Sequence, residues 1–173
     1  MDSPRHRIVV GVSGSVGSLH ALRAAVMQAR RAPGDGLHAV LAWAPPGGEI
    51  PNRNGVPGRL LEVWVEAARR RLAEAFDDAM GGVPVDIAVT QHIVRGRPGH
   101  VLVEVAREAD LLVVGAGDHG AFHRLAVGSV SRHCLAHASC PVLVVPPPPL
   151  LRTAQARRLA RVTHWHRVGP YPW

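Results

Sequence analysis

Short apolar runs that alternate with helical segments are the feature that most limits the fold of this chain. Largely apolar runs cover residues 7–12, 37–43, 111–114 and 142–145, and a run in which apolar and polar residues alternate covers 85–94. Strands that are apolar on both faces are typical of parallel sheets covered by helices. The pattern predicts the order β-α-β-α-β-α-β-α-β, which is a doubly wound α/β domain with a five-stranded parallel sheet and helices on both faces.

Four helices are expected between these strands, because apolar residues recur there at helical spacing. The first ends near Arg31, and Gly81 and Gly82 end the second, which is the longest. Pro98 begins the third, a position where proline is favoured. The fourth runs from about Ser129 to His137 and leads into the last strand.

The length of 173 residues and the hydrophobic content of 47% fit one domain with some chain to spare. We expect the domain to cover residues 1–146 and a Pro/Arg-rich C-terminal extension to cover 147–173. No apolar stretch is long enough to span a bilayer, and the N-terminus lacks the pattern of a signal peptide. Two cysteines, Cys134 and Cys140, do not make a disulfide framework. These features predict a cytoplasmic protein that does not enter the membrane.

The net charge of +7 raises the question of nucleic-acid binding. All 20 basic residues are arginine, and five of them follow Pro149, where there is no Asp or Glu. Subtracting these five charges from +7 leaves +2 for residues 1–149. The domain is therefore close to neutral, and we do not expect nucleic acid as its partner. Only the basic extension has the charge for weak, salt-sensitive binding, although such a run is more often a solvated helix face.

Two glycine-rich loops follow directly after strands, at Gly11–Ser18 and Gly115–Gly128. In open parallel sheets, ligands bind beyond the carboxyl ends of the strands, where the winding direction reverses. If the first and fourth strands are neighbours, these two loops face each other across a crevice. Gly128 and Ser129 also open a helix, whose free N–H groups and partial positive charge suit a phosphate, although a mobile loop with a Ser-capped helix would give the same pattern.

Two motifs for other functions fit poorly. The run from Gly115 to Gly120 matches G-x-G-x-x-G, but no acidic residue follows Asp118 to hold a ribose, which disfavours a dinucleotide fold. The run from Gly11 to Ser15 places Ser13 in a turn like a nucleophile elbow but lacks the final glycine. We therefore do not expect an enzyme.

A metal site is the third alternative. His133 and His137 lie four residues apart, and Cys134 and Cys140 are near them in the sequence. Cysteine is equally common as a small core residue in a helix that leads into a buried strand, and the histidines fit an outer polar stripe. We expect no metal.

The strongest pattern combines several short segments. They are Ile8–Ser15, Leu19–Leu22, Leu111–Ala116, Gly128–Ser131 and Leu135–Pro146. Together they resemble the universal stress protein family, and the resemblance covers Arg7 to Pro146. It implies a sheet of order 3-2-1-4-5 and a homodimer formed through the last strand. The strand residues implied at that interface are Val142, Leu143, Val144 and Val145.

Some members of that family bind ATP through a pattern of glycine, two residues, glycine, nine residues, glycine, and then serine or threonine. Gly115, Gly128 and Ser129 fall on this pattern, whereas Asp118 stands at the position of the second glycine. An aspartate beside a triphosphate adds repulsion.

Two more departures fall on the same expected pocket. Ser13 stands where the family commonly has an aspartate that contacts the nucleoside. Trp43 stands at the end of the second strand, where a smaller apolar residue usually lines the base pocket, so its indole either stacks on adenine or fills its place.

The resemblance thus implies a regulatory module of the stress response that binds an adenine nucleotide, with ATP and Mg²⁺ as the possible ligand. The alternative is a homodimeric interaction protein with a degenerate cleft that does not bind ATP. The residues implied at the nucleotide site are Gly11, Val12, Ser13, Trp43, Val114, Gly115, Gly117, Asp118, Gly120, Gly128, Ser129 and Val130.

Overall fold

The computed structural model of the protein describes residues 6–31, 36–45, 57–117 and 127–146. The elements are β1 (Arg7–Gly11), α1 (Val16–Arg31), β2 (Gly36–Trp43), α2 (Gly58–Met80), β3 (Ala88–Arg95), α3 (Pro98–Val105), β4 (Leu111–Gly115), α4 (Ser129–His137) and β5 (Val142–Val145). The C-terminal extension lies outside the described residues. Within the described ranges, no helix is both long and apolar enough to cross a membrane.

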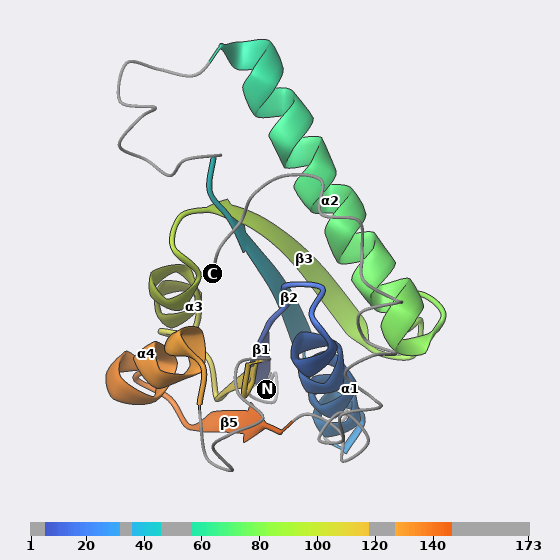
Figure 1. Cartoon of the computed structure of the whole chain (residues 1–173). Helices are drawn as coiled ribbons and strands as arrows, with labels where there is room; N and C mark the ends of the chain where they lie inside the picture. Colours follow the sequence, from blue (N-terminus) through green and yellow to red (C-terminus); the bar gives the residue numbers. More distant parts are fainter. Residues whose placement is uncertain (1–5, 32–35, 46–56, 118–126, 147–173) are drawn as a thin grey trace, which may run out of the picture.

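All five strands form one parallel sheet in the order β3-β2-β1-β4-β5 (Figure 1). The predicted α/β fold and strand order are therefore confirmed. The winding direction reverses between β1 and β4, where Val9 lies opposite Leu112. This pairing brings the carboxyl ends of β1 and β4 together, so the two glycine-rich loops begin side by side.

Helices cover both faces of the sheet, with α1 and α2 on one and α3 and α4 on the other (Figure 1). Because side chains alternate along a strand, each face has its own core. Val10 and Leu37 face α1 and α2 and are fully buried. Val9 and Leu112 face α3 and α4 and are also fully buried. The apolar strands thus fill two cores at once, as the sequence pattern predicts.

One predicted boundary is wrong. We expected the third strand to begin at Val85, but β3 begins at Ala88, and Val85 is fully exposed. The reason is that β2 begins at Gly36, which pairs with Ala88, so residues before Ala88 have no neighbouring strand. Asp86 instead forms an ion pair of two hydrogen bonds with Arg30 at the end of α1, at 2.6 and 3.1 Å.

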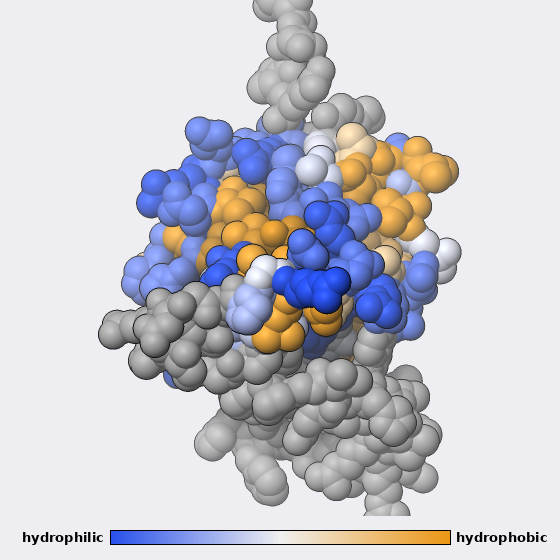
Figure 2. Space-filling model, turned by 90° about the horizontal axis from the view of Figure 1, so that it is seen from above, coloured by the Kyte–Doolittle hydropathy of each residue, from blue (hydrophilic) through white to orange (hydrophobic). Residues whose placement is uncertain are grey.

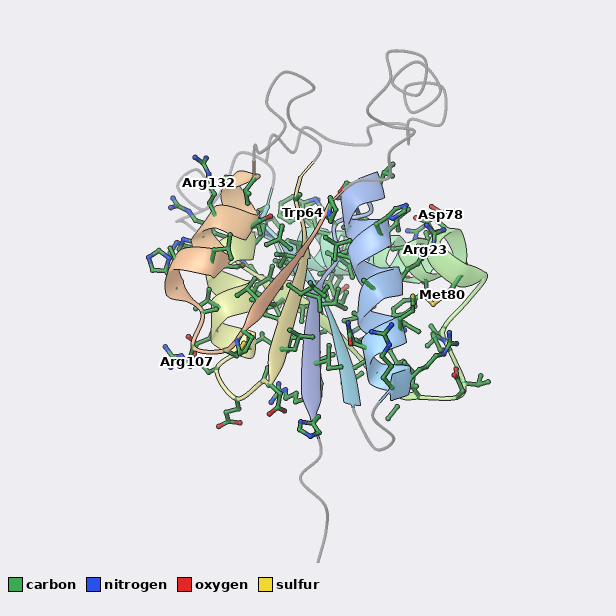
Figure 3. All side chains as sticks on the ribbon, turned by 90° about the horizontal axis from the view of Figure 1, so that it is seen from below. Arg23, Trp64, Asp78, Met80, Arg107 and Arg132 are labelled. Atoms are coloured by element: carbon green, nitrogen blue, oxygen red, sulfur yellow. The ribbon has the colours of Figure 1, made fainter. Side chains whose placement is uncertain are left out.

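Helix α2 extends beyond the sheet at its N-terminal end (Figure 1). Its buried residues begin only at Ala68, while Leu60 and Val63 are 42% and 59% exposed. Figure 2, which views the molecule from above, shows hydrophobic residues exposed among hydrophilic ones on that side. At the other end of α2, Arg23 of α1 donates hydrogen bonds to the carbonyl oxygens of Ala79 and Asp78, at 2.5 and 3.0 Å (Figure 3).

Two half-buried histidines pair across neighbouring strands. Nδ1 of His38 in β2 lies 2.8 Å from Nε2 of His92 in β3, and the rings are stacked. Burial lowers the pKa of both histidines below its ordinary value, and the nearby Arg7 lowers the pKa of both further. In the folded protein the pair is therefore favoured in its neutral form, in which one ring donates a hydrogen bond to the other.

This pair makes stability depend on pH. Because the folded pKa values lie below the unfolded value of about 6.5, the unfolded chain takes up protons first as the pH falls. The free energy of unfolding should be constant above that pH and should decrease below it. We expect the urea midpoint to fall between pH 7.5 and pH 5.5, and to fall less in His38→Gln. An equal fall in both proteins would show that the pair does not contribute.

Candidate nucleotide-binding site

Three serines shape the loop between β1 and α1. The Ser15 hydroxyl accepts a hydrogen bond from the N–H of Ser18 at 3.3 Å, so Ser15 caps α1. The Ser13 hydroxyl donates to that of Ser15 at 3.2 Å, and the Ser13 N–H donates to the Ser18 hydroxyl at 3.1 Å. The loop at the carboxyl end of β1 is therefore a fixed turn that presents neutral hydroxyl groups.

An arginine from α2, which the sequence did not point to, lies against this loop. Gly14 has a φ of 78°, and a Cβ atom added there would lie 3.2 Å from Nε of Arg71 and 4.0 Å from its Nη2. Side chains of a helix lean toward its N-terminus, which lets Arg71 reach up to the loop. No local pattern signals this contact, because the two residues are far apart in the sequence.

The glycines of the second loop pack against backbone. A Cβ atom on Gly115 would lie 2.6 Å from the carbonyl carbon and oxygen of Gly17, in the first turn of α1. Gly117 has a φ of 88°, and a Cβ there would lie 3.1 Å from Cα of Gly128. The N–H of Gly128 also donates to the carbonyl oxygen of Ala116 at 2.7 Å. These glycines thus close the base of the loop and join it to α1, in addition to any role at a ligand.

Helix α4 begins without a side-chain cap. Its N-cap residue is Gly128, and among the described residues no side chain caps the first N–H groups, so the Ser-capped alternative is wrong for this helix. Ser131 is 2% exposed, and its hydroxyl donates to the carbonyl oxygen of Gly115 at 2.5 Å. This hydrogen bond, which the sequence analysis did not foresee, holds the first turn of α4 to the end of β4. The N–H groups at the start of α4 remain suited to an anion.

Trp43 fills the end of β2. It is 7% exposed, belongs to the core on the α1 and α2 face, and packs against Trp64 of α2 with ring centroids 6.5 Å apart at 56°. Of the two roles expected for Trp43, this packing favours filling the space over standing open for a base. Among the described residues, the half-buried Trp64 offers further aromatic surface beside Trp43.

The remaining implied site residues divide into buried and accessible ones. Val12 and Val114 are buried. A Cβ on Gly11 would lie 2.7 Å from the Leu102 side chain. These three residues therefore form the packed layer beneath the loops. Ser129 is exposed and Val130 is half-buried at the start of α4. Two other implied residues, Asp118 and Gly120, lie outside the described residues.

The possible metal ligands do not converge. His133 stacks on His137 and touches His100 of α3, with centroids 4.3 Å apart in both pairs. Cys134 is fully buried, and burial raises the pKa of its thiol to about 11, which disfavours the thiolate that binds metals. Among the described residues, no group of three His, Cys, Asp or Glu side chains is arranged to hold a metal ion.

Comparison with known proteins gives matches over the whole domain. A model of the universal stress protein family matches residues 4–146. A universal stress protein of Thermus aquaticus is 36% identical over 135 residues, which are 75% of this chain and 92% of the relative. One from Mycolicibacterium smegmatis is 34% identical over 140 residues, which are 81% of this chain and 45% of the relative. The chain thus spans about half the length of its mycobacterial relatives.

Solved structures agree with the fold. A universal stress protein in complex with cAMP is 27% identical with a TM-score of 0.51, and the match covers 84% of this chain and all of that one. The universal stress protein UspA of Lactobacillus plantarum is 24% identical with a TM-score of 0.60, covering 83% of this chain and 99% of that one.

The contact between Gly115 and Gly17 generates a stability prediction. Gly115→Ala forces a methyl group into backbone that cannot move aside, so we expect a loss of about 3 kcal/mol in the free energy of unfolding. Gly36→Ala is the matched control, because a Cβ there would lie at an ordinary 3.6 Å from the His38 ring. Urea unfolding of both variants measures the difference, and equal stability would contradict the close approach.

Proposed function

The chain belongs to the universal stress protein family, and from that premise we propose that it is a cytoplasmic regulatory module of the stress response that binds an adenine nucleotide and catalyses no reaction. The main support is the start of α4, where the N-cap is a glycine and no described side chain caps the helix, at the end of the sheet where the winding reverses. Such a helix start accepts a phosphate group. The relative solved with cAMP supports an adenine nucleotide as the ligand class.

The adenine base of the proposed ligand meets different side chains from its phosphate. Because Trp43 is buried against Trp64, the base meets an indole wall in this region and not an open apolar pocket. Aromatic faces stack on purines, so this wall is compatible with adenine at the rim of the cleft. We propose ATP with Mg²⁺, AMP and cAMP as the ligands to compare.

A second candidate function rests on the same tryptophan. If Trp43 closes the cleft to any base, the protein is an interaction module whose cleft holds no nucleotide. Its regulatory action would then depend on its surfaces alone.

Calorimetry separates the two functions and tests the role of Asp118. We expect the wild type to bind at least one of ATP, AMP and cAMP, and Asp118→Gly to bind ATP several-fold more tightly, because one unfavourable charge contact near phosphate costs about 1 kcal/mol. Weaker binding by Asp118→Gly only in the presence of Mg²⁺ would show that Asp118 holds the ion. No heat from either protein at millimolar nucleotide would leave the interaction module as the function.

We further propose a homodimer formed through β5. The carbonyl oxygens of Pro141 and Val145 accept hydrogen bonds from the β4 side, at 3.0 and 2.9 Å. Because backbone groups alternate in direction along a strand, those of Val142 and Val144 point away from β4. Such an edge invites pairing with a second copy. Both cysteines are free, which agrees with a reducing compartment such as the cytoplasm.

A proline in β5 should break this dimer. Val144→Pro removes the N–H that points outward and keeps the hydrogen bonds to β4, because proline is tolerated on an edge whose N–H faces solvent. We expect monomers by light scattering at tens of micromolar, where the wild type is a dimer. Substitution of Val144 by arginine is less suitable, since its side chain packs on the core beneath α3 and α4. A monomeric wild type would contradict the proposal.

A further inference from the structure

We propose that the C-terminal extension of this chain, residues 147–173, docks on the exposed N-terminal end of its own helix α2. This end, residues 58–66, is called the α2 overhang. The contact is inferred from the surface of the overhang and from the sequence of the extension, which itself lies outside the described residues. It goes beyond the proposed function and holds with or without a bound nucleotide.

The overhang is apolar on two sides. Leu61, Trp64 and Val65 pack toward the core on the face of the sheet that α2 covers. Leu60 and Val63 lie outside this stripe and are 42% and 59% exposed. A helix that is apolar on more than its core-facing stripe is typical of one that packs against a second element.

The rest of α2 does not share this feature. Further along the helix, the side that carries Leu60 and Val63 carries Arg70, Glu74 and Asp78, at the helical spacing of three or four residues. The charged residues lie where α2 packs on the sheet, and the apolar pair lies where α2 extends beyond it (Figure 1). The change from charged to apolar on one side of the helix marks the overhang as a surface for a further segment.

Two carboxylates border the exposed apolar surface. Glu62 and Glu66 are exposed, and together with Arg59, Val63 and Arg70 they line an open depression of about 430 Å³. Among the described residues, no ion pair involves Glu62 or Glu66. Their charges are therefore free to attract a cationic segment, and the arginines at the two ends of the depression confine that attraction to its centre.

The extension has a matching composition. It carries five arginines and no Asp or Glu, and the apolar residues Leu159, Val162 and Trp165 stand among the arginines. The loop before α2, residues 46–56, is less suitable, because its larger aliphatic residues are only Ile50 and Val56 and its one arginine is balanced by one glutamate. Apolar and cationic side chains in one segment suit a surface that offers aliphatic groups beside carboxylates.

The extension is long enough to reach the overhang. It follows β5, and the carboxyl end of β5 lies at the same end of the sheet as the start of α2 (Figure 1). Three strand spacings separate β5 from β2 in the sheet, which is about 15 Å at the usual spacing. The 27 residues after Pro146 would span about 40 Å even at the short rise of a helix.

A segment of the same chain fits this surface better than a second copy does. Stable interfaces between proteins bury roughly 1,600 Å², and two exposed aliphatic side chains beside an open depression provide far less. A tethered segment has an effective concentration in the millimolar range, so a small contact is enough to hold it. The size of the apolar surface therefore favours the extension.

Hydrogen exchange of the full chain, measured by mass spectrometry, tests this contact. We expect amides of residues 150–167 to exchange roughly tenfold more slowly than in a free peptide of the same sequence, because a small tethered contact protects only modestly. Leu60→Ser with Val63→Ser removes the apolar contact without adding charge and should raise these rates to those of the peptide. Leu135→Ser is the matched control, because Leu135 of α4 is also exposed, at 52%, and should leave the extension unchanged.

A second variant tests the charges. Glu62→Gln with Glu66→Gln should reduce the protection of the extension, because it removes the carboxylates that attract the arginines. Peptides of β1 and β4 report on folding in the same experiment and should exchange as in the wild type. If the double serine variant disturbs them, Val63→Ser alone takes its place.

Several results would overturn the proposal. Rapid exchange of the extension in the wild type would show that it does not dock. Full protection in either double variant, or loss of protection in Leu135→Ser, would show that the contact lies elsewhere. Protection that increases with protein concentration would show that a second copy makes the contact.

Discussion

The close approach of two backbones, at Gly115 of β4 and Gly17 of α1, is the constraint on which the site depends. Gly115 has no room for a side chain, since a Cβ there would lie 2.6 Å from the Gly17 carbonyl. The contact fixes the first turn of α1 against the end of β4 and so sets the relative position of the two glycine-rich loops. The hydrogen bond from Ser131 to the Gly115 carbonyl then places α4 on the same strand end. Loop, strand and helix are thus joined at one residue.

This arrangement changes how the glycine motif is understood. Glycines in such loops are usually explained by the approach of phosphate oxygens to the backbone. Here Gly115, Gly117 and Gly128 each have backbone as their nearest neighbour. Their spacing therefore has a structural reason that holds with or without a ligand. The motif can persist in a member of the family that does not bind ATP, which is why the chemistry of the surrounding side chains has to decide the function.

The sequence predicted the fold well because the relevant signals are local. The apolar runs at β1, β4 and β5 and the glycines that end α2 depend only on neighbouring residues. The predicted start of β3 was wrong because a strand extends only as far as its neighbouring strand does. The neighbour, β2, begins at Gly36, and the residues around Val85 carry no information on that position. The sequence also left two roles open for Trp43, because the contact that decides between them, with Trp64 of α2, joins segments that are apart in the chain. Arg71 escaped notice entirely, because its neighbour in the fold is a loop far away in the chain.

The site also joins the two layers of the protein. Trp64 belongs to α2, which packs on one face of the sheet, while Ser129 and Ser131 belong to α4 on the other. A ligand held by both would connect cores that otherwise share only the strands between them. Any ligand that binds the folded state alone also stabilises it, by an amount that grows with the logarithm of its concentration once the site is filled. Occupancy of this site would therefore resist separation of α2 and α4 from the sheet, and α4 leads into the edge strand β5. A nucleotide at the site would in this way act on the helix that precedes β5, the strand through which a second copy of the chain is proposed to pair.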